Sequence, residues 1–334
     1  MDTVVPLFSD SAAHWLPLAL PGQVNGEAPF GVVCMGRPLV LYRDASGAVR
    51  AMEDRCVHRR APLSLGRITP DGRLQCGYHG WTYDGATGAC VAIPNLSEHE
   101  RVPAHYVARA YETRERDGFV WGRATRGVDA GEPADAASPP SRCTQRFAGS
   151  ATVAVACDEY VAALADGPHL LMRIAGVRIT DYVIADPEPR GGRVGMERGV
   201  TWAASRRNHR FGAHYPWTFR LTSPQDGALA SVELDTRDGA PMLWASIAIV
   251  PAARGATNVL WRGGVAADTG GVGAALFRLW ARLRRSPFAM LEHVDARALS
   301  KLDVSCSRAW PRPHPQAACA GPVGVDRLPC SRSR

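Results

Sequence analysis

The sequence is organised around two short segments, Cys56-Val57-His58 and Cys76-Gly77-Tyr78-His79, which are separated by seventeen residues. Each segment combines one thiol with one imidazole. Thiolates and neutral imidazoles are the side chains that bind zinc, copper and iron in proteins. Two such pairs so close in the chain predict a metal centre held by two neighbouring loops.

The order of the ligand types distinguishes two kinds of metal centre. Structural zinc sites usually take two cysteines from one segment and two histidines from another. Here each segment supplies one of each, which is the ligand set of a Rieske [2Fe–2S] cluster. We therefore expect Cys56 and Cys76 to bind one iron and His58 and His79 to bind the other. A structural zinc site is the alternative.

The residues around these segments carry a family resemblance. They read DRCVHRRAPLSLGR over 54–67 and GRLQCGYHGWTYD over 72–84. This resembles the Rieske domain of the Rieske non-haem iron oxygenases, most closely the branch that includes pheophorbide a oxygenase. Respiratory Rieske proteins add a disulfide across the loops and a hydroxyl near the sulfurs, where this chain has Ala61, Tyr78 and Trp81. Fewer hydrogen bonds to the cluster predict a lower potential.

Frequent turns divide the first third of the chain into short β-like runs, and these predict an all-β cluster domain over 1–123. The next segment is rich in Ala, Asp, Pro, Gly and Ser, which predicts a linker over 124–142. A first strand-like run over 147–156 is followed by a helix-like segment over 158–171 and by further strand-like runs over 177–265. They are followed by a predicted long helix over 272–302 that is interrupted at Pro287.

The whole pattern predicts an α+β chain. The resemblance implies that residues 143–304 are a helix-grip catalytic domain, in which an antiparallel sheet curls around the long C-terminal helix. Inward-facing apolar residues would then line the substrate pocket: Val200, Trp202, Phe219, Trp244 and Ile247. Residues 305–334 lack periodicity and are expected to be a disordered tail.

Composition and charge limit where the protein is expected to be located and what it is expected to bind. No run of about eighteen apolar residues predicts a membrane span, and the N-terminus lacks the basic region of a signal peptide. Of the nine cysteines, the seven outside the ligand pairs show no paired spacing, which fits a reducing cytoplasm. The net charge of +7 comes from scattered arginines, with the densest group at 282, 284 and 285. This pattern is not a nucleic-acid stripe; it indicates an Arg-rich surface or a docking face for an acidic reductant.

The resemblance implies a second, mononuclear Fe(II) site made of two histidines and a carboxylate. Asp166-Gly167-Pro168-His169 matches the Asp-x-x-His part of the family motif. His169 would be an iron ligand, and Asp166 would link this iron to the cluster. Asp295 would be the carboxylate ligand, with Asp303 as a rival.

The same motif departs from the family at two positions. The second histidine would fall at Ile174, and the asparagine that precedes Asp166 by three residues is Ala163. Three interpretations stay open: another histidine (His209, His214 or His293) completes the site, the site binds iron weakly, or the site is silent.

The resemblance therefore implies an oxidoreductase, the terminal component of a mono- or dioxygenase that oxidises a bulky apolar small molecule with O2. Its partners would be a ferredoxin or flavin reductase and two further copies in a head-to-tail homotrimer. No nucleic-acid or membrane partner is expected. The alternative is a catalytically silent Rieske electron-transfer protein or partner subunit.

Overall fold

The computed structural model describes residues 15–97, 99–123, 131–133, 143–190, 193–203, 215–224, 229–266, 270–283 and 285–299. Apart from residues 131–133, the predicted linker lies outside the described residues, and so does the predicted tail. No helix in these ranges is long and apolar enough to cross a membrane.

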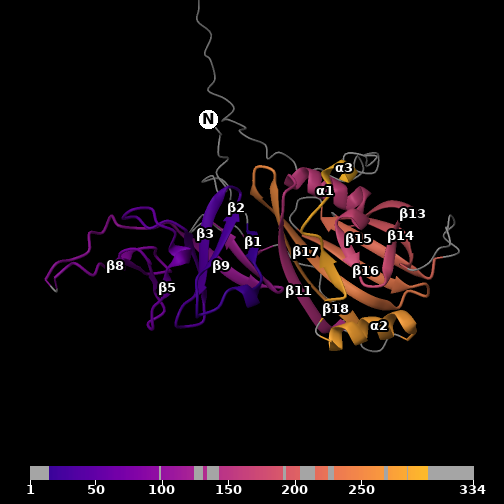
Figure 1. Ribbon diagram of the computed structural model, residues 1–334, viewed down its shortest axis with the longest axis horizontal. Coiled ribbons are helices and arrows are strands. Elements are labelled where there is room, and N and C mark those ends of the chain that lie inside the picture. Colours follow the sequence, from indigo (N-terminus) through magenta and orange to yellow (C-terminus); the bar gives the residue numbers. More distant parts are fainter. Residues whose placement is uncertain are drawn as a thin grey trace, which may run out of the picture.

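Two antiparallel sheets form the first part of the chain (Figure 1). The larger has the strand order β1-β10-β9-β4-β3-β2. Its strands are β1 (Leu16–Ala19), β2 (Phe30–Cys34), β3 (Arg37–Arg43), β4 (Val49–Glu53), β9 (Ala110–Arg116) and β10 (Phe119–Arg123). The smaller has the order β5-β6-β7-β8, with β5 (Arg67–Ile68), β6 (Leu74–Gln75), β7 (Thr82–Tyr83) and β8 (Cys90–Ala92). Short 3-10 helices η1 (Pro21–Gln23) and η2 (Leu63–Leu65) lie between strands.

A nine-stranded antiparallel sheet forms the second part, in the order β11-β18-β17-β16-β15-β14-β13-β12-β19. Its strands are β11 (Cys143–Val153), β12 (Met172–Ile174), β13 (Val177–Arg190), β14 (Arg193–Trp202), β15 (Trp217–Pro224), β16 (Leu229–Thr236), β17 (Pro241–Ala253), β18 (Ala256–Ala266) and β19 (Phe288–Met290). The helices are α1 (Cys157–Asp166), η3 (Pro168–Leu170), α2 (Val272–Arg282) and α3 (Ala296–Leu299). The predicted α+β class is confirmed.

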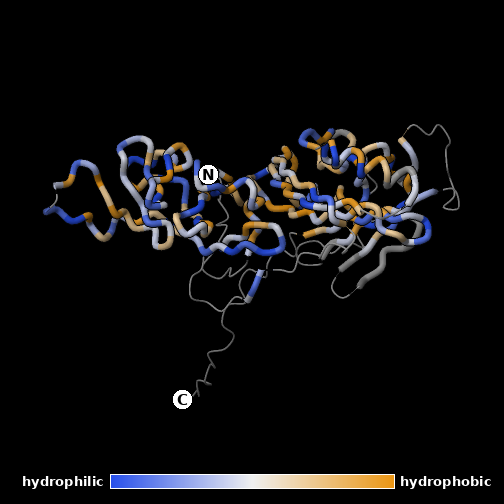
Figure 2. The backbone as a smooth tube through the Cα atoms, turned by 90° about the horizontal axis from the view of Figure 1, so that it is seen from below, coloured by the Kyte–Doolittle hydropathy of each residue, from blue (hydrophilic) through white to orange (hydrophobic). Residues whose placement is uncertain are grey.

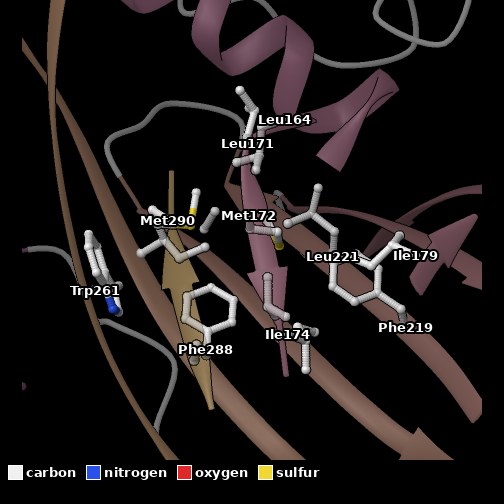
Figure 3. Packing of buried hydrophobic residues seen from close by; sticks show 14 of the residues in the cluster. Leu164, Leu171, Met172, Ile174, Ile179, Phe219, Leu221, Trp261, Phe288 and Met290 are labelled. Atoms are coloured by element: carbon white, nitrogen blue, oxygen red, sulfur yellow. The ribbon is translucent and has the colours of Figure 1, made fainter. Parts of the chain in front are cut away.

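Strand β17 is buried on both faces. Leu243, Ala245, Ile247 and Ile249 belong to the main core, which also contains residues of α1 and β12 (Figure 3). The alternate residues face the first part of the chain, where Ala248 packs with Trp15, Phe119 and Trp121, and Val250 packs with Leu41. A strand that is covered on both sides has a nearly continuous run of apolar residues in its sequence. Figure 2 shows hydrophobic stretches in both parts of the chain.

Backbone and side-chain polar contacts also join the two parts. The amides of Met35 and Gly36 donate to the carbonyls of Pro251 and Ala252, at 2.7 and 2.6 Å. The guanidinium of Arg262 lies over the rings of Phe119 and Trp244, at 5.4 and 5.3 Å. The all-β first part is therefore docked on the outer face of the nine-stranded sheet.

The prediction of one long helix over 272–302 is wrong. The chain instead forms α2, the short strand β19 and then α3. Pro287 cannot donate a helical hydrogen bond, and the next three residues pair with β12 in the register Phe288↔Ile174 to Met290↔Met172. This pairing buries Phe288 and Met290 in the main core.

The packing predicts a strong dependence of stability on the buried residues of β3. Leu41 is fully buried, and Leu65 is 77 % exposed. We expect Leu41→Ala to lower the free energy of unfolding by about 2–5 kcal/mol, because it leaves a cavity in the core. The matched change Leu65→Ala should alter it by less than about 0.5 kcal/mol. Urea unfolding of both variants measures this, and equal losses would contradict the packing described here.

Candidate metal centres

The two ligand segments lie in two loops, 56–61 and 76–81, that share one backbone hydrogen-bond pattern. In each loop the cysteine amide donates to the carbonyl of the residue five positions later, at 2.8 Å. The residue four positions later donates to the cysteine carbonyl, at 2.8 Å in the first loop and 3.1 Å in the second. That residue has a positive φ in both loops, 58° at Arg60 and 72° at Gly80. The two loops therefore have the same backbone conformation around their ligands.

The thiols and the imidazoles occupy different depths. Cys56 and Cys76 are both buried, whereas His58 and His79 are both exposed. The two imidazole rings lie 4.7 Å apart, centroid to centroid. Two neighbouring thiols below two neighbouring imidazoles suit a [2Fe–2S] cluster, with one iron inside the protein and the other at its surface.

Burial and backbone amides act in opposite directions on the Cys76 thiol, and its pKa is raised overall. Burial raises the pKa of the Cys76 thiol, while hydrogen bonds from the amides of Tyr78 and His79 lower it. An amide that donates to sulfur stabilises the thiolate, which is the form that binds iron. Desolvation, followed by the neighbouring His79 and Arg59, lowers the pKa of His58. A lower pKa favours the neutral imidazole that a metal requires.

Tyr83 contributes a hydrogen bond that the sequence reasoning missed. Its Oη lies 3.0 Å from Cys56 Sγ and accepts a hydrogen bond from the amide of Val57 at 3.2 Å. When Cys56 is a thiolate, its sulfur only accepts, so Tyr83 donates to it. The sequence did contain a hint of this contact, because Tyr83 follows Cys76 by only seven residues and lies on the next strand, β7.

Trp81 is the residue of this chain at the position compared above with the hydroxyl of respiratory Rieske proteins. Its ring stacks on His58, with centroids 4.7 Å apart and an angle of 4° between the planes. This contact orients the imidazole of the first loop from the second loop.

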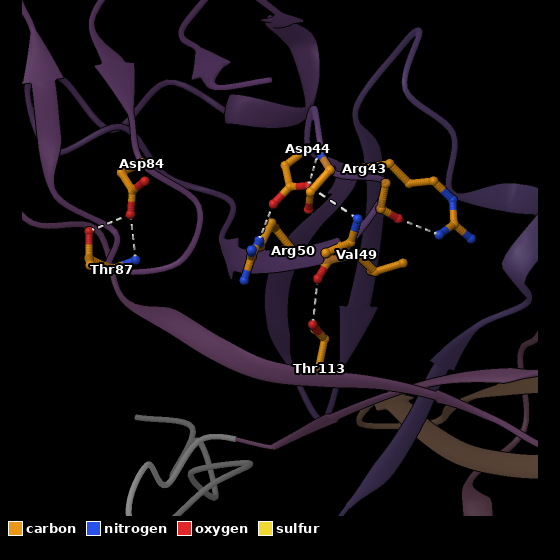
Figure 4. A network of polar contacts seen from close by, with 10 residues as sticks. Arg43, Asp44, Val49, Arg50, Asp84, Thr87 and Thr113 are labelled. Atoms are coloured by element: carbon orange, nitrogen blue, oxygen red, sulfur yellow. Dashed lines mark hydrogen bonds and ion pairs between the residues drawn. The ribbon is translucent and has the colours of Figure 1, made fainter. Parts of the chain in front are cut away.

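Polar contacts hold both loops on the sheets behind them. Asp54 accepts hydrogen bonds from the amide and the hydroxyl of Ser64, both at 2.6 Å. Asp84 follows Tyr83 and accepts from the amide and hydroxyl of Thr87, at 2.8 and 2.7 Å (Figure 4). At Gly66 a Cβ would lie 2.1 Å from the carbonyl oxygen of Gln75, so the segment after the first loop passes close to strand β6, which leads into the second.

The described residues contain no group of three or more His, Cys, Asp or Glu side chains arranged to hold a single ion. A [2Fe–2S] cluster takes only two protein ligands on each iron, so this finding is compatible with it. A zinc site would need all four side chains to converge on one ion. The separation of two buried thiols from two exposed imidazoles is what favours the cluster over the zinc alternative.

The predicted second site begins at the end of α1. Asp166 is the last residue of this helix, and His169 lies in η3. Asp166 Oδ1 and His169 Nδ1 are both shielded from solvent. Arg198 on β14 is buried, and its Nη2 donates to the carbonyls of Ala165 and Asp166, at 2.9 and 2.8 Å. The helix thus ends against a buried cation.

The C-terminal candidates return toward this helix end. The amide of Leu291 donates to the carbonyl of Leu171 at 2.8 Å, which continues the pairing of β19 with β12. His293 and Asp295 follow and are exposed. Among the described residues, no three side chains that include these and Asp166 or His169 are grouped around one point. His209, His214 and Asp303 lie outside the described residues.

The two departures from the family motif are core positions. Ile174 is buried in β12, and Ala163 is buried on α1. A histidine at position 174 would point into the apolar core beside Phe288, which explains why a hydrophobic residue fits there.

The predicted pocket residues divide between two faces. Val200, Phe219 and Ile247 belong to the main core, and Trp202 packs edge-on against Trp217 at 4.5 Å. The prediction for Trp244 is wrong, because this side chain packs with Cys143 and Ala266 on the other face of the sheet. The alternation of side chains along a strand sends residues 244 and 247 to opposite faces.

Comparison with known proteins places the first part in a family. Residues 14–108 match the Rieske [2Fe-2S] domain. The chain is 43 % identical over 112 residues to protein TIC 55 of Arabidopsis thaliana, which covers 34 % of this chain and 20 % of that protein. It is 48 % identical over 85 residues to pheophorbide a oxygenase of Oryza sativa subsp. japonica, which covers 25 % and 16 %. The chain thus spans about a fifth of the length of these relatives.

A solved structure extends the similarity beyond the first domain. Dicamba monooxygenase bound to 3,6-dichlorosalicylic acid superposes with a TM-score of 0.57 at 23 % identity, over 81 % of this chain and 83 % of that one. At this identity the match establishes the fold. The chain therefore contains a Rieske [2Fe–2S] domain at residues 14–108 and has the fold of the Rieske oxygenases.

Proposed function

We propose that this protein is the terminal component of a Rieske-type oxygenase. The observation that carries the proposal is the pair of matched loops, with buried thiols and surface imidazoles, in a chain that has the oxygenase fold. We assign Cys56 and Cys76 to the inner iron and His58 and His79 to the outer iron. A bound [2Fe–2S] cluster supplies electrons one at a time.

The loops determine how the reductant and the cluster meet. His58 and His79 are exposed, and the neighbouring Arg59 and Arg60 are exposed as well. An acidic ferredoxin or flavin reductase would be attracted to this basic surface. Trp81 holds the ring of His58, and Tyr83 donates to Cys56, so the chain fixes the ligand geometry before an electron arrives.

The overall reaction follows from the proposed class. For a hydroxylation, the substrate C–H bond, one O2, two electrons and two protons give the alcohol and one water. The reductase supplies both electrons. We assign His169 and Asp295 to the mononuclear Fe(II) and Asp166 to the link between the metals. That iron would supply O2 activation. The substrate class is a bulky apolar small molecule, and a cytoplasmic homotrimer belongs to the same proposal.

A second candidate function is a catalytically silent Rieske electron-transfer protein or partner subunit. It is favoured by Ile174, a core residue where the family motif has a histidine. In this case the cluster would accept and donate electrons without a substrate site in the same chain.

Metal analysis separates the two candidates. For the reconstituted protein we expect about three irons and two acid-labile sulfides per chain, because the cluster contains two of each and the second site adds one iron. A ratio of two to two would overturn the oxygenase proposal in favour of the silent form. Absence of sulfide would exclude the cluster.

Two histidine variants test the assignment of each metal. His79→Ala should abolish the visible absorption of the cluster, because the outer iron loses one of its two protein ligands. His169→Ala should leave that absorption intact and reduce the iron content from about three to about two per chain. His99→Ala, which removes another exposed imidazole, is the control and should change neither. An unchanged iron content in His169→Ala would mean that the mononuclear site lies elsewhere.

The hydrogen bond from Tyr83 predicts a shift in the reduction potential. Tyr83→Phe removes the donor to Cys56 Sγ, so the oxidised cluster becomes relatively more stable and the potential falls. A redox titration followed by visible absorption measures the change. Tyr78→Phe removes an exposed hydroxyl from the second ligand loop and should leave the potential where it is. Equal potentials for Tyr83→Phe and the unmodified protein would exclude this role.

A further inference from the structure

Helix α2 carries an exposed apolar stripe. Leu276, Leu279 and Trp280 on α2 and Leu283 directly after it are between 36 % and 62 % exposed, and the amide of Leu283 donates to the carbonyl of Leu279 at 3.0 Å. These four are among only nine large apolar side chains that are exposed in the described part of the chain, and they fall within eight residues. Their spacing of three, one and three residues places them within an arc of about 100° on a helix. The stripe is therefore one continuous surface.

The opposite side of the helix is anchored in the protein. Phe277 is fully buried in the main core, and α2 packs on β11 and β18. Figure 1 shows the helix at the lower edge of the molecule, with no other labelled element beneath it. The helix is thus held firmly while its stripe forms a projecting ridge. A ridge can meet a broad flat surface, whereas a groove would be shaped for a peptide.

Only positive charge accompanies the stripe. Residues 270–287 contain four arginines and no aspartate or glutamate. Arg282 and Arg285 are exposed and have no ion-pair partner among the described residues. A helix with leucine and tryptophan on one face and arginine beside it is the composition of segments that lie in a membrane interface. Leu279 and Leu283 would enter the acyl boundary, and the arginines would meet anionic head groups.

We propose that α2 is a peripheral docking surface for an anionic lipid membrane. At about 1.5 Å per residue the helix is about 16 Å long, so it would lie flat on the bilayer without crossing it. The sequence alone predicted no membrane partner, because it contains no apolar span. An acidic protein would match the charge but would leave the leucines without an apolar environment. The lipid surface satisfies both features.

Vesicle co-sedimentation of the full, cluster-loaded chain tests this proposal. We expect binding to phosphatidylglycerol-containing vesicles, weak binding to pure phosphatidylcholine vesicles, and a decline in binding as NaCl is raised. The double variant Arg282→Gln/Arg285→Gln should bind anionic vesicles about tenfold or more weakly. Leu279→Gln/Leu283→Gln should lose about as much, since it removes the buried apolar contact.

Matched controls exclude a general effect of charge or misfolding. Arg67→Gln/Arg73→Gln removes two exposed arginines from the four-stranded sheet and should bind as the unmodified protein does. The visible absorption of the cluster reports that each variant is folded. Binding that is absent, or that survives both α2 double variants, would overturn the proposal. So would a dimer that disappears in Leu279→Gln/Leu283→Gln without any vesicle binding, because the stripe would then join two copies of the chain.

Discussion

The double burial of β17 is the constraint on which the arrangement of the molecule depends. One face of this strand completes the main core under α1, and the other face is the floor on which the first part of the chain packs. Each large side chain on this strand therefore contributes apolar burial on one side or the other. The strand cannot shift by one residue without exchanging the two sets of side chains. The register of β17 thus fixes which side chains face the core of the nine-stranded sheet and which face the first part of the chain.

The cluster loops depend on the sheets behind them for their shape. Neither loop has a regular secondary structure of its own around the ligands, and each one closes by two backbone hydrogen bonds around its cysteine. Contacts from outside the first loop then fix its side chains: Tyr83 on Cys56, and Trp81 of the second loop on His58. Matching two loops that are seventeen residues apart requires both to be attached to one rigid framework. The four-stranded sheet and η2 provide it.

The end of α1 shows a different balance of forces. The helix stops at Asp166 because Gly167 and Pro168 follow, and the buried guanidinium of Arg198 binds the carbonyls that the helix leaves without partners. The strand β19 brings the C-terminal segment back beside this point. Core packing at Ile174 and Phe288 dominates the region, so a hydrophobic side chain occupies the position of the motif histidine.

The sequence by itself determined the cluster-type ligand pairs, the α+β class and the strand-rich character of both parts, because ligand spacing and apolar periodicity are local properties. It also predicted Asp166 and His169 as site residues through a short motif. The tertiary structure decided what depends on distant contacts. Only packing shows that Trp244 faces away from the core, that Tyr83 reaches Cys56, and that residues 288–290 form a strand. Helix periodicity predicted otherwise for that last segment, because pairing with β12 and the missing amide of Pro287 outweigh local propensity. Likewise, the sequence places four arginines near the stripe of α2, but only the fold shows that its leucines are uncovered.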